Sequence, residues 1–144
     1  MKVYLDNCMF NRPFDDQSQI RIRLETEAKL YIQSLIKDGS LTLIWSYILD
    51  FENAQNPHND RKKSVGIWKN LASIDIEATP DLLGKAKEFT EQGIRAKDAL
   101  HLASAIEGGA DYFLSTDDKL LSKIQKITLL NALNPVDFIK ELEK

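Results

Sequence analysis

Four carboxylates stand at positions where they could act together. Asp6 directly follows the apolar segment 2–5, and Asp117 follows a second strand-like segment, DYFLST. Glu52 lies within two turns of the start of one predicted helix, and Asp98 lies in the first turns of another. Carboxylates gathered in one place repel one another unless a cation holds them. If the fold brings these acids to one edge, we expect them to share a cation.

Such a cluster suits Mg²⁺ or Mn²⁺, because hard cations prefer carboxylate and water ligands. The site can activate water and neutralise the charge that develops on a phosphoryl group, and two cations about 3.5–4 Å apart could bind both the attacking and the leaving oxygen. Spacing alone leaves open the alternative that these acids are ordinary helix caps, since the chain has 22 Asp and Glu residues. The chemistry that the cluster favours is phosphodiester hydrolysis.

Strand-like and helix-like segments alternate along the chain and must position these acids. Short apolar or alternating segments bounded by turn residues predict strands, and apolar residues at helical spacing predict helices. The predicted strands are residues 2–6, 41–46, 73–79, 111–116 and 127–131. The predicted helices are residues 17–37, 47–56, 59–71, 80–92, 97–107, 117–124 and a last helix that starts at 134–135. Residues 7–16, which include Pro13, are expected to form a loop.

The longest predicted helix, residues 17–37, carries a stripe of apolar side chains. The stripe consists of Ile20, Leu24, Ala28, Tyr31 and Leu35. It can be an interface with a partner or ordinary core, and the exposure of these side chains would separate the two.

The alternation predicts an α/β fold with a mostly parallel central sheet and helices on both faces. The chain has 144 residues, of which 43% are hydrophobic and 28% charged, and this suits a single domain over residues 1–144. In such sheets ligands bind beyond the carboxyl ends of the strands. Asp6 and Asp117 are expected at that edge.

Composition excludes several classes of protein. No apolar run approaches the roughly 18 residues of a membrane span, and Asp6 interrupts the only candidate for a secretory signal, so a cytoplasmic protein is expected. The single cysteine, Cys8, cannot form an internal disulfide, and a Cys/His zinc site is disfavoured because only His58 and His101 could join it. The net charge of −3 argues against a broad cationic surface for nonspecific binding of nucleic acid.

Three stretches of the sequence carry a resemblance to a known family. They are YLDNCMF at the start, WSYILDFEN in the first third, and KDALHLASAIEGGADYFLSTDDKLL. The last is the most specific, with an acid, an alanine-rich helix, a glycine pair, an aromatic strand and a Ser/Thr-x-Asp ending in order. The sequence resembles the PIN-domain family, metal-dependent ribonucleases best known from the VapC-type toxins of bacterial toxin–antitoxin modules, over nearly the whole chain. The resemblance implies a PIN-like fold and an endoribonuclease that uses Mg²⁺ or Mn²⁺.

The resemblance also implies roles for individual residues. The catalytic and metal-binding acids would be Asp6, Glu52, Asp98 and Asp117. Two further acids, Asp50 and Asp118, rival Glu52 and Asp117; Asp50 and Glu52 are two residues apart, about 200° around a helix, and cannot both face one metal.

Supporting side chains are expected around these acids. The side chains that would hold the ligands or a water are Asn7, Ser46, Ser115 and Asp118. At the position of Asn7, many toxins of the family have Thr or Ser. Ser46 could instead simply cap its helix. Arg12, Lys97 and Lys119 are candidates for contacts with RNA phosphates.

Histidine and the aromatic residues have two interpretations each. His101, three residues after Asp98, is either a packed histidine bonded to backbone or carboxylate, which we favour, or a general base. The aromatic side chains could stack on bases but are more often core; they are Tyr4, Trp45, Tyr47 and Trp68.

If the toxin interpretation holds, the family implies an RNA substrate, a small antitoxin whose tail covers the active site, and a homodimer. An alternative is a catalytically inactive PIN-like scaffold that binds RNA or protein. A phosphoacceptor or phosphatase on a similar sheet is a further alternative, but LDNCM lacks the second Asp of acid-nucleophile phosphatases and no Lys follows ITLLN.

Overall fold

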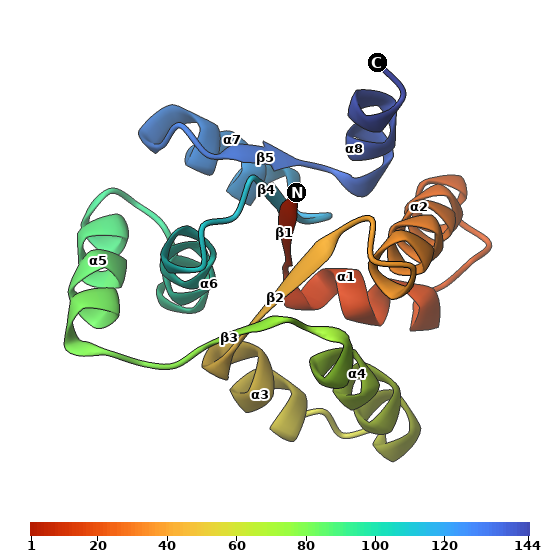
Figure 1. Cartoon of the computed structure of the whole chain (residues 1–144), viewed down its shortest axis with the longest axis horizontal. Helices are drawn as coiled ribbons and strands as arrows, with labels where there is room; N and C mark the ends of the chain where they lie inside the picture. The colour runs from red at the N-terminus through yellow and green to blue at the C-terminus, as the bar shows by residue number, and fades with distance from the viewer.

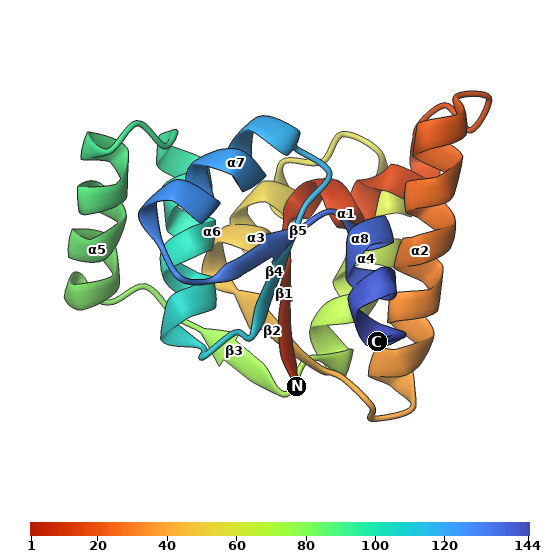
Figure 2. The ribbon, with the colours of Figure 1, turned by 90° about the horizontal axis from the view of Figure 1, so that it is seen from above.

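A parallel five-stranded sheet forms the centre of the molecule (Figures 1 and 2). The computed structural model describes residues 1–144. The strands are β1 (Lys2–Leu5), β2 (Thr42–Ser46), β3 (Ile74–Ile76), β4 (Tyr112–Leu114) and β5 (Asn131–Leu133), in the order β3-β2-β1-β4-β5. Every neighbouring pair is parallel, and Val3 of β1 stands opposite Leu43 of β2 and Tyr112 of β4. The predicted α/β fold is confirmed, and the strand order reverses at β1.

Helices cover both faces of this sheet. They are α1 (Asn7–Asn11), α2 (Ile20–Lys37), α3 (Tyr47–Ala54), α4 (Asn59–Leu71), α5 (Pro80–Glu91), α6 (Ala96–Glu107), α7 (Asp118–Ile127) and α8 (Pro135–Leu142), with a short 3₁₀ helix, η1, at Arg12–Phe14. Figures 1 and 2 show α2 and α8 together on one side of the sheet and α5 and α6 on the other. None of the helices is both long and apolar enough to cross a membrane.

The central strands are buried on both sides. Val3, Tyr4 and Leu5 of β1 are at most 1% exposed, as are Leu43 to Ser46 of β2. A strand of a parallel sheet that is covered on both faces carries a continuous run of buried residues rather than an alternating pattern. The buried central strand β1 leads directly into Asp6.

The segment between β1 and α2 differs from the sequence prediction. Residues 7–16 were expected to be a loop, but α1 and η1 occupy most of it. The Asp6 carboxylate accepts the backbone N–H of Asn7 and so caps α1, and Pro13 lies in the first turn of η1, where its missing N–H costs nothing. The predicted loop is wrong because local capping chemistry outweighs the turn-forming residues.

The last strand also differs from its prediction. The expected strand at 127–131 is observed at Asn131–Leu133, and Ile127 belongs to α7. The Thr128 hydroxyl donates to the carbonyl of Ile124 and extends the helix end, while Leu129 is fully exposed. A short apolar run such as ITLL fits the end of a helix as well as a strand. The hydrophobic pattern therefore could not show where α7 ends and β5 begins.

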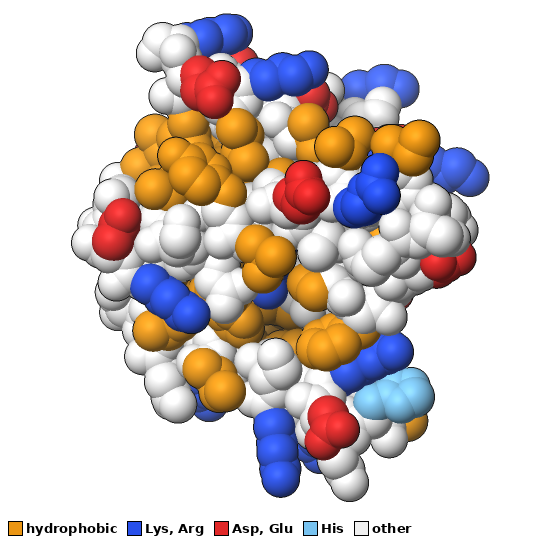
Figure 3. All heavy atoms as spheres, turned by 90° about the vertical axis from the view of Figure 1, so that its right-hand side faces the viewer, with side chains coloured by type: hydrophobic (Ala, Val, Ile, Leu, Met, Phe, Trp, Pro, Cys, Tyr) orange, Lys and Arg blue, Asp and Glu red, His pale blue; other side chains and the backbone are white.

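The apolar stripe predicted for the longest helix is only partly buried. Ala28 is 5% exposed, but Ile20, Leu24 and Tyr31 are between 49% and 66% exposed. The helix buries Ile32 and Ile36 instead, together with the polar residues Glu25, Thr26 and Lys29. The stripe is therefore a partly open surface on the side of α2 and α8, where Figure 3 shows exposed hydrophobic side chains between charged ones.

Candidate active site

Asp6 stands at the carboxyl end of the central strand β1. Its backbone N–H still bonds to the carbonyl of Leu114 at 3.0 Å, which continues the pairing with β4. Its carboxylate accepts the N–H of Asn7 at 2.7 Å and the hydroxyl of Ser115 at 2.9 Å. The residue is 7% exposed. The sheet and the start of α1 together fix the direction of this carboxylate.

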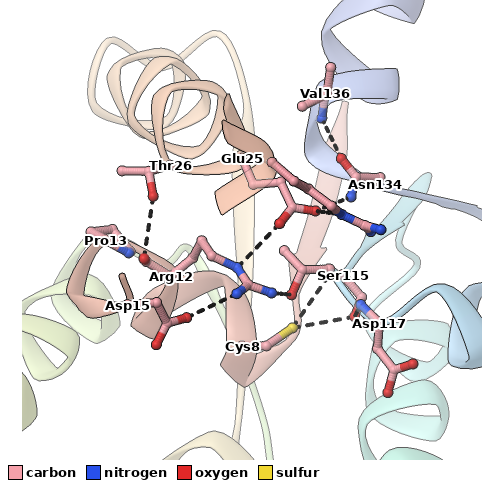
Figure 4. Close-up of polar contacts among 12 residues, drawn as sticks. Cys8, Arg12, Pro13, Asp15, Glu25, Thr26, Ser115, Asp117, Asn134 and Val136 are labelled. Carbon is pink, nitrogen blue, oxygen red and sulfur yellow. Dashed lines mark hydrogen bonds and ion pairs between the residues drawn. The ribbon is translucent and has the colours of Figure 1, made fainter. Parts of the chain in front are cut away.

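Ser115 connects Asp6 to Asp117. The Ser115 hydroxyl donates to Asp6, and its oxygen accepts the N–H of Asp117 at 3.1 Å. The Asp117 carboxylate in turn accepts the N–H of Leu120 at 3.2 Å and caps α7. Cys8 lies in the same group, with its sulfur 3.4 Å from the Ser115 oxygen (Figure 4), and burial raises the pKa of its thiol to about 12. The predicted supporting role of Ser115 has a geometric basis in this contact.

Glu52 approaches Asp6 from α3 through a shared histidine. Its Oε1 contacts Nε2 of His101 on α6, and the same nitrogen lies 3.7 Å from Oδ1 of Asp6. The other carboxylate oxygen of Glu52 accepts the amide of Asn7 at 3.4 Å. Although burial opposes protonation of His101, its bond with Glu52 and the charge of Asp6 leave its pKa above the ordinary value.

Asp98 lies in the first turn of α6. It lines a hollow of about 50 Å³ together with Asp117 and Lys119. Burial and the negative charges of Asp6, Asp117 and Glu52 raise the pKa of Asp98 to about 6, while His101 opposes the rise. The sheet edge therefore brings the four predicted acids into one electrostatic group.

The donor chemistry of this group fits a hard divalent cation. Its members offer carboxylate oxygens. Burial first, and then the charges of the other acids, raise the pKa of Asp98, and a nearby cation would favour its ionised form. In this arrangement no group of three or more His, Cys, Asp and Glu side chains is placed to hold a metal ion. A bound cation would require these side chains to draw closer together.

The rival acids point elsewhere. Asp50 accepts the indole N–H of Trp45 at 2.9 Å and pairs with Lys69 at 3.0 Å. Asp118, expected to support the site, pairs through both oxygens with the Arg21 guanidinium, whose hydrogen bonds hold the pKa of Asp118 below its ordinary value. Neither carboxylate joins the group around Asp6.

The three predicted RNA-contacting residues lie in different surroundings, and they do not all adjoin the acids. Lys119 lines the hollow beside the acids. The Lys97 ammonium lies 5.9 Å from the centre of the Phe51 ring. Arg12 is held inside the protein, where it pairs with Asp15 and Glu25 and donates to Thr116 at 2.6 Å (Figure 4). Of the three side chains, Lys119 lies beside the acids.

Tyr4 belongs to the site, although the sequence suggested core or base stacking. Its buried hydroxyl lies 2.7 Å from Ser46 Oγ and 2.6 Å from Nδ1 of His101. Ser46 makes no side-chain cap bond to α3, so its hydroxyl serves this contact instead of its helix. One signal was present in the sequence: Tyr4 and Asp6 are two residues apart on a strand and so share a face. Trp45 and Trp68 are buried in the core.

Comparisons with known proteins give structural neighbours. No family model and no curated protein matches the sequence. A chain of VapBC2 from Rickettsia felis, in a crystal structure bound to a DNA fragment from their promoter, has a TM-score of 0.58 and 16% identity; the match covers 93% of this chain and 98% of that one. PAE2754 from Pyrobaculum aerophilum has a TM-score of 0.57 and 16% identity, over 99% and 96% of the two chains. At this identity the comparison establishes the fold: the chain has the PIN-domain fold of VapC-like proteins.

Proposed function

We propose that this protein is a metal-dependent endoribonuclease that hydrolyses RNA phosphodiester bonds with Mg²⁺ or Mn²⁺, as the toxin of a type II toxin–antitoxin module. The proposal is supported by contacts that link the four acids in pairs. His101 lies between Glu52 and Asp6, and Ser115 connects Asp6 to Asp117. Asp117 and Asp98 line one hollow. Burial and repulsion from the other three acids raise the pKa of Asp98, a pattern expected where a cation normally balances the charge. The PIN-domain fold supports the same reaction class.

The four acids would hold the cation, and the residues around them would orient them. A bound Mg²⁺ or Mn²⁺ would supply Lewis-acid stabilisation of the phosphoryl charge and a more acidic water. Ser115 and the N–H of Asn7 hold Asp6, and the N–H of Leu120 holds Asp117. The backbone and a serine therefore set the directions of two of the carboxylates before any ligand arrives, which lowers the cost of organising the site.

Basic side chains beside the acids would receive the RNA backbone. Arg95, Lys119 and Lys123 line the same hollow as Asp98 and Asp117. Lysine and arginine supply the charge that neutralises nucleic-acid phosphates. A phosphodiester placed between these cations and the four acids would have its reacting phosphorus next to the site.

An antitoxin partner and a homodimer are part of the proposal. The neighbour from Rickettsia felis is named as a VapBC complex, and the side of α2 and α8 leaves Ile20, Leu24 and Tyr31 exposed (Figure 3). Exposed apolar side chains gathered on one side are typical of a surface that contacts another chain. Copurification of this protein with the product of a neighbouring gene would test the antitoxin, and light scattering would test the dimer.

The experiment that tests the activity compares the wild type with Asp6→Asn on a mixed RNA pool in Mg²⁺, Mn²⁺ and EDTA. Asparagine keeps the shape of Asp6 but removes its charge, so we expect metal-dependent cutting to fall by about 100-fold or more. Asp50→Asn is the matched control, since Asp50 bonds to Trp45 and Lys69 instead of the site. Equal cutting by Asp6→Asn and the wild type would contradict the proposal. RNA binding without cutting in any metal would favour the inactive scaffold instead.

A further inference from the structure

A buried chain of hydrogen bonds reaches Glu52 from the interior of the protein. It runs from Ser46 Oγ to the Tyr4 hydroxyl at 2.7 Å, from that hydroxyl to His101 Nδ1 at 2.6 Å, and from His101 Nε2 to Glu52. Ser46, Tyr4 and His101 are each at most 1% exposed. The members come from β1, from β2 and from two different helices, so the chain exists only in the folded protein.

The donors and acceptors of this chain match in two arrangements, and both place a proton on Nε2 of His101. With neutral His101, Ser46 donates to Tyr4, Tyr4 donates to Nδ1, and the Nε2–H donates to the Glu52 carboxylate. With protonated His101, Nδ1–H donates to Tyr4, Tyr4 donates to Ser46, and Nε2–H still donates to Glu52. The one arrangement that fails is a neutral ring protonated on Nδ1, since it would turn a nitrogen lone pair towards the carboxylate. The Glu52 carboxylate therefore favours a ring that presents an N–H to it, and the hydroxyls of Tyr4 and Ser46 can bond to that ring in either protonation state.

Glu52 needs such a contact to keep its place. A glutamate has three side-chain torsions, and its carboxylate is otherwise bound by the long 3.4 Å contact with Asn7. His101 holds the carboxylate within reach of Asp6, because the same Nε2 is 3.7 Å from Asp6 Oδ1. The Tyr4 ring is packed on Phe113, with 5.6 Å between ring centres, so the base of the chain is rigid.

We propose that His101, fixed by Tyr4 and Ser46, is a positioning residue that holds Glu52 beside Asp6 and so preorganises the candidate cation site. The inference rests on the proposed function for the identity of the site, but its central contact can be measured without RNA. His101 acts through Glu52 and does not itself bind the cation. Partners that orient a ligand in this way typically change metal affinity by about 10–100-fold when removed.

The first test compares Mn²⁺ affinity in two substitutions of His101, measured by electron paramagnetic resonance of free Mn²⁺. His101→Leu keeps the bulk and removes the N–H, so we expect affinity to fall by about 10–100-fold. His101→Gln keeps an N–H donor near the position of Nε2, so we expect affinity close to the wild type. His58→Leu, at the other histidine of the chain, lies on an exposed loop and is the control. Affinity of His101→Leu equal to that of the wild type, with both proteins folded by circular dichroism, would overturn the proposal.

The second test measures which nitrogen of the His101 ring carries a proton in the metal-free protein. A long-range ¹H–¹⁵N spectrum has two histidine rings to assign, and His58→Leu identifies each. We expect Nε2 of His101 to carry a proton in the wild type, and Tyr4→Phe to shift or broaden the His101 signals, because the ring loses its contact at Nδ1. A ring without a proton on Nε2 would refute the positioning role. If the wild type binds no Mn²⁺, the proposed function fails, and this spectrum then decides whether His101 holds Glu52.

Discussion

Asp98 shows how the four acids affect one another at the scale of single residues. Its carboxyl is half-buried near Asp6, Asp117 and Glu52, and this environment raises its pKa to about 6. The folded protein therefore binds a proton more readily than the unfolded chain between about pH 4 and 6. The stability that this proton contributes is complete below pH 4 and is lost as the pH rises through 6. At neutral pH the metal-free site carries an unfavourable charge.

Asp98→Asn should change stability in opposite directions with and without metal. In EDTA at pH 7 we expect the variant to be more stable than the wild type by about 1 kcal/mol, because the repelling charge is gone. In Mn²⁺ we expect the wild type to gain more stability than the variant, which has lost one ligand. Thermal denaturation in both buffers measures this. A variant that is less stable than the wild type in EDTA would contradict the repulsion.

At the scale of elements, α2 packs against α4 through a charged residue. The Lys29 ammonium is buried 4.7 Å from the centre of the Trp68 ring and bonds to Gln33. Burial lowers its pKa to about 8. Between about pH 8 and 10.5 the unfolded chain keeps a proton that the folded protein has released, so stability rises with pH in this window. Below pH 8 the two helices bury a charge at a cost that the ring only partly offsets.

Lys29→Met should stabilise the packing of α2 on α4 near neutral pH. Methionine fills a similar volume without a charge, so we expect the free energy of unfolding at pH 7 to rise by about 1–3 kcal/mol. The advantage should shrink above pH 8, where Lys29 becomes neutral. Urea denaturation at pH 7 and pH 10 measures both, and Lys63→Met, at an exposed position of α4, is the control. A Lys29→Met protein that is less stable at pH 7 would show that the cation–ring contact dominates.

At the scale of the whole molecule, Glu25 joins distant parts of the chain. It is 2% exposed, pairs with Arg12 of η1 and Arg21 of α2, and accepts the amide of Asn134 before α8 (Figure 4). Arg12 extends this connection to Thr116, next to Asp117. Residues 109 positions apart in sequence are thus held together beside the candidate site. Removing one partner of such a buried ion pair destabilises the fold strongly, because the other partner is left as a buried charge without compensation.

Glu25→Gln should therefore weaken the whole fold. Glutamine removes the charge that Arg12 and Arg21 share, and we expect a loss of about 3–5 kcal/mol in the free energy of unfolding, measured in urea. Glu27→Gln, exposed on the same helix, should leave the midpoint unchanged. Similar midpoints for the two variants would mean that Glu25 is not a structural hub.

The order of elements could largely be predicted from the sequence, because it depends on local information, while the roles of the four acids stay a prediction. Apolar runs and caps located β1, β2 and most helices, and Thr79 caps α5 through Leu82 as its Thr-Pro-Asp start predicted. The separation of Asp50 from Glu52 followed from helix geometry alone. The boundaries failed where one pattern fits two structures, as at 127–131, or where a side chain supplies a cap, as Asp6 does for α1.

What the sequence by itself determined was the α/β class and the placement of carboxylates at strand and helix ends, since each follows from spacing along a few residues. Only the tertiary structure decided which neighbours these residues meet. It joined Tyr4, Ser46, His101 and Glu52 from four elements. It also enclosed Glu25 and Lys29, each one residue after a position of the predicted apolar stripe. Contacts between segments distant in sequence depend on strand order and helix packing, which no local pattern encodes.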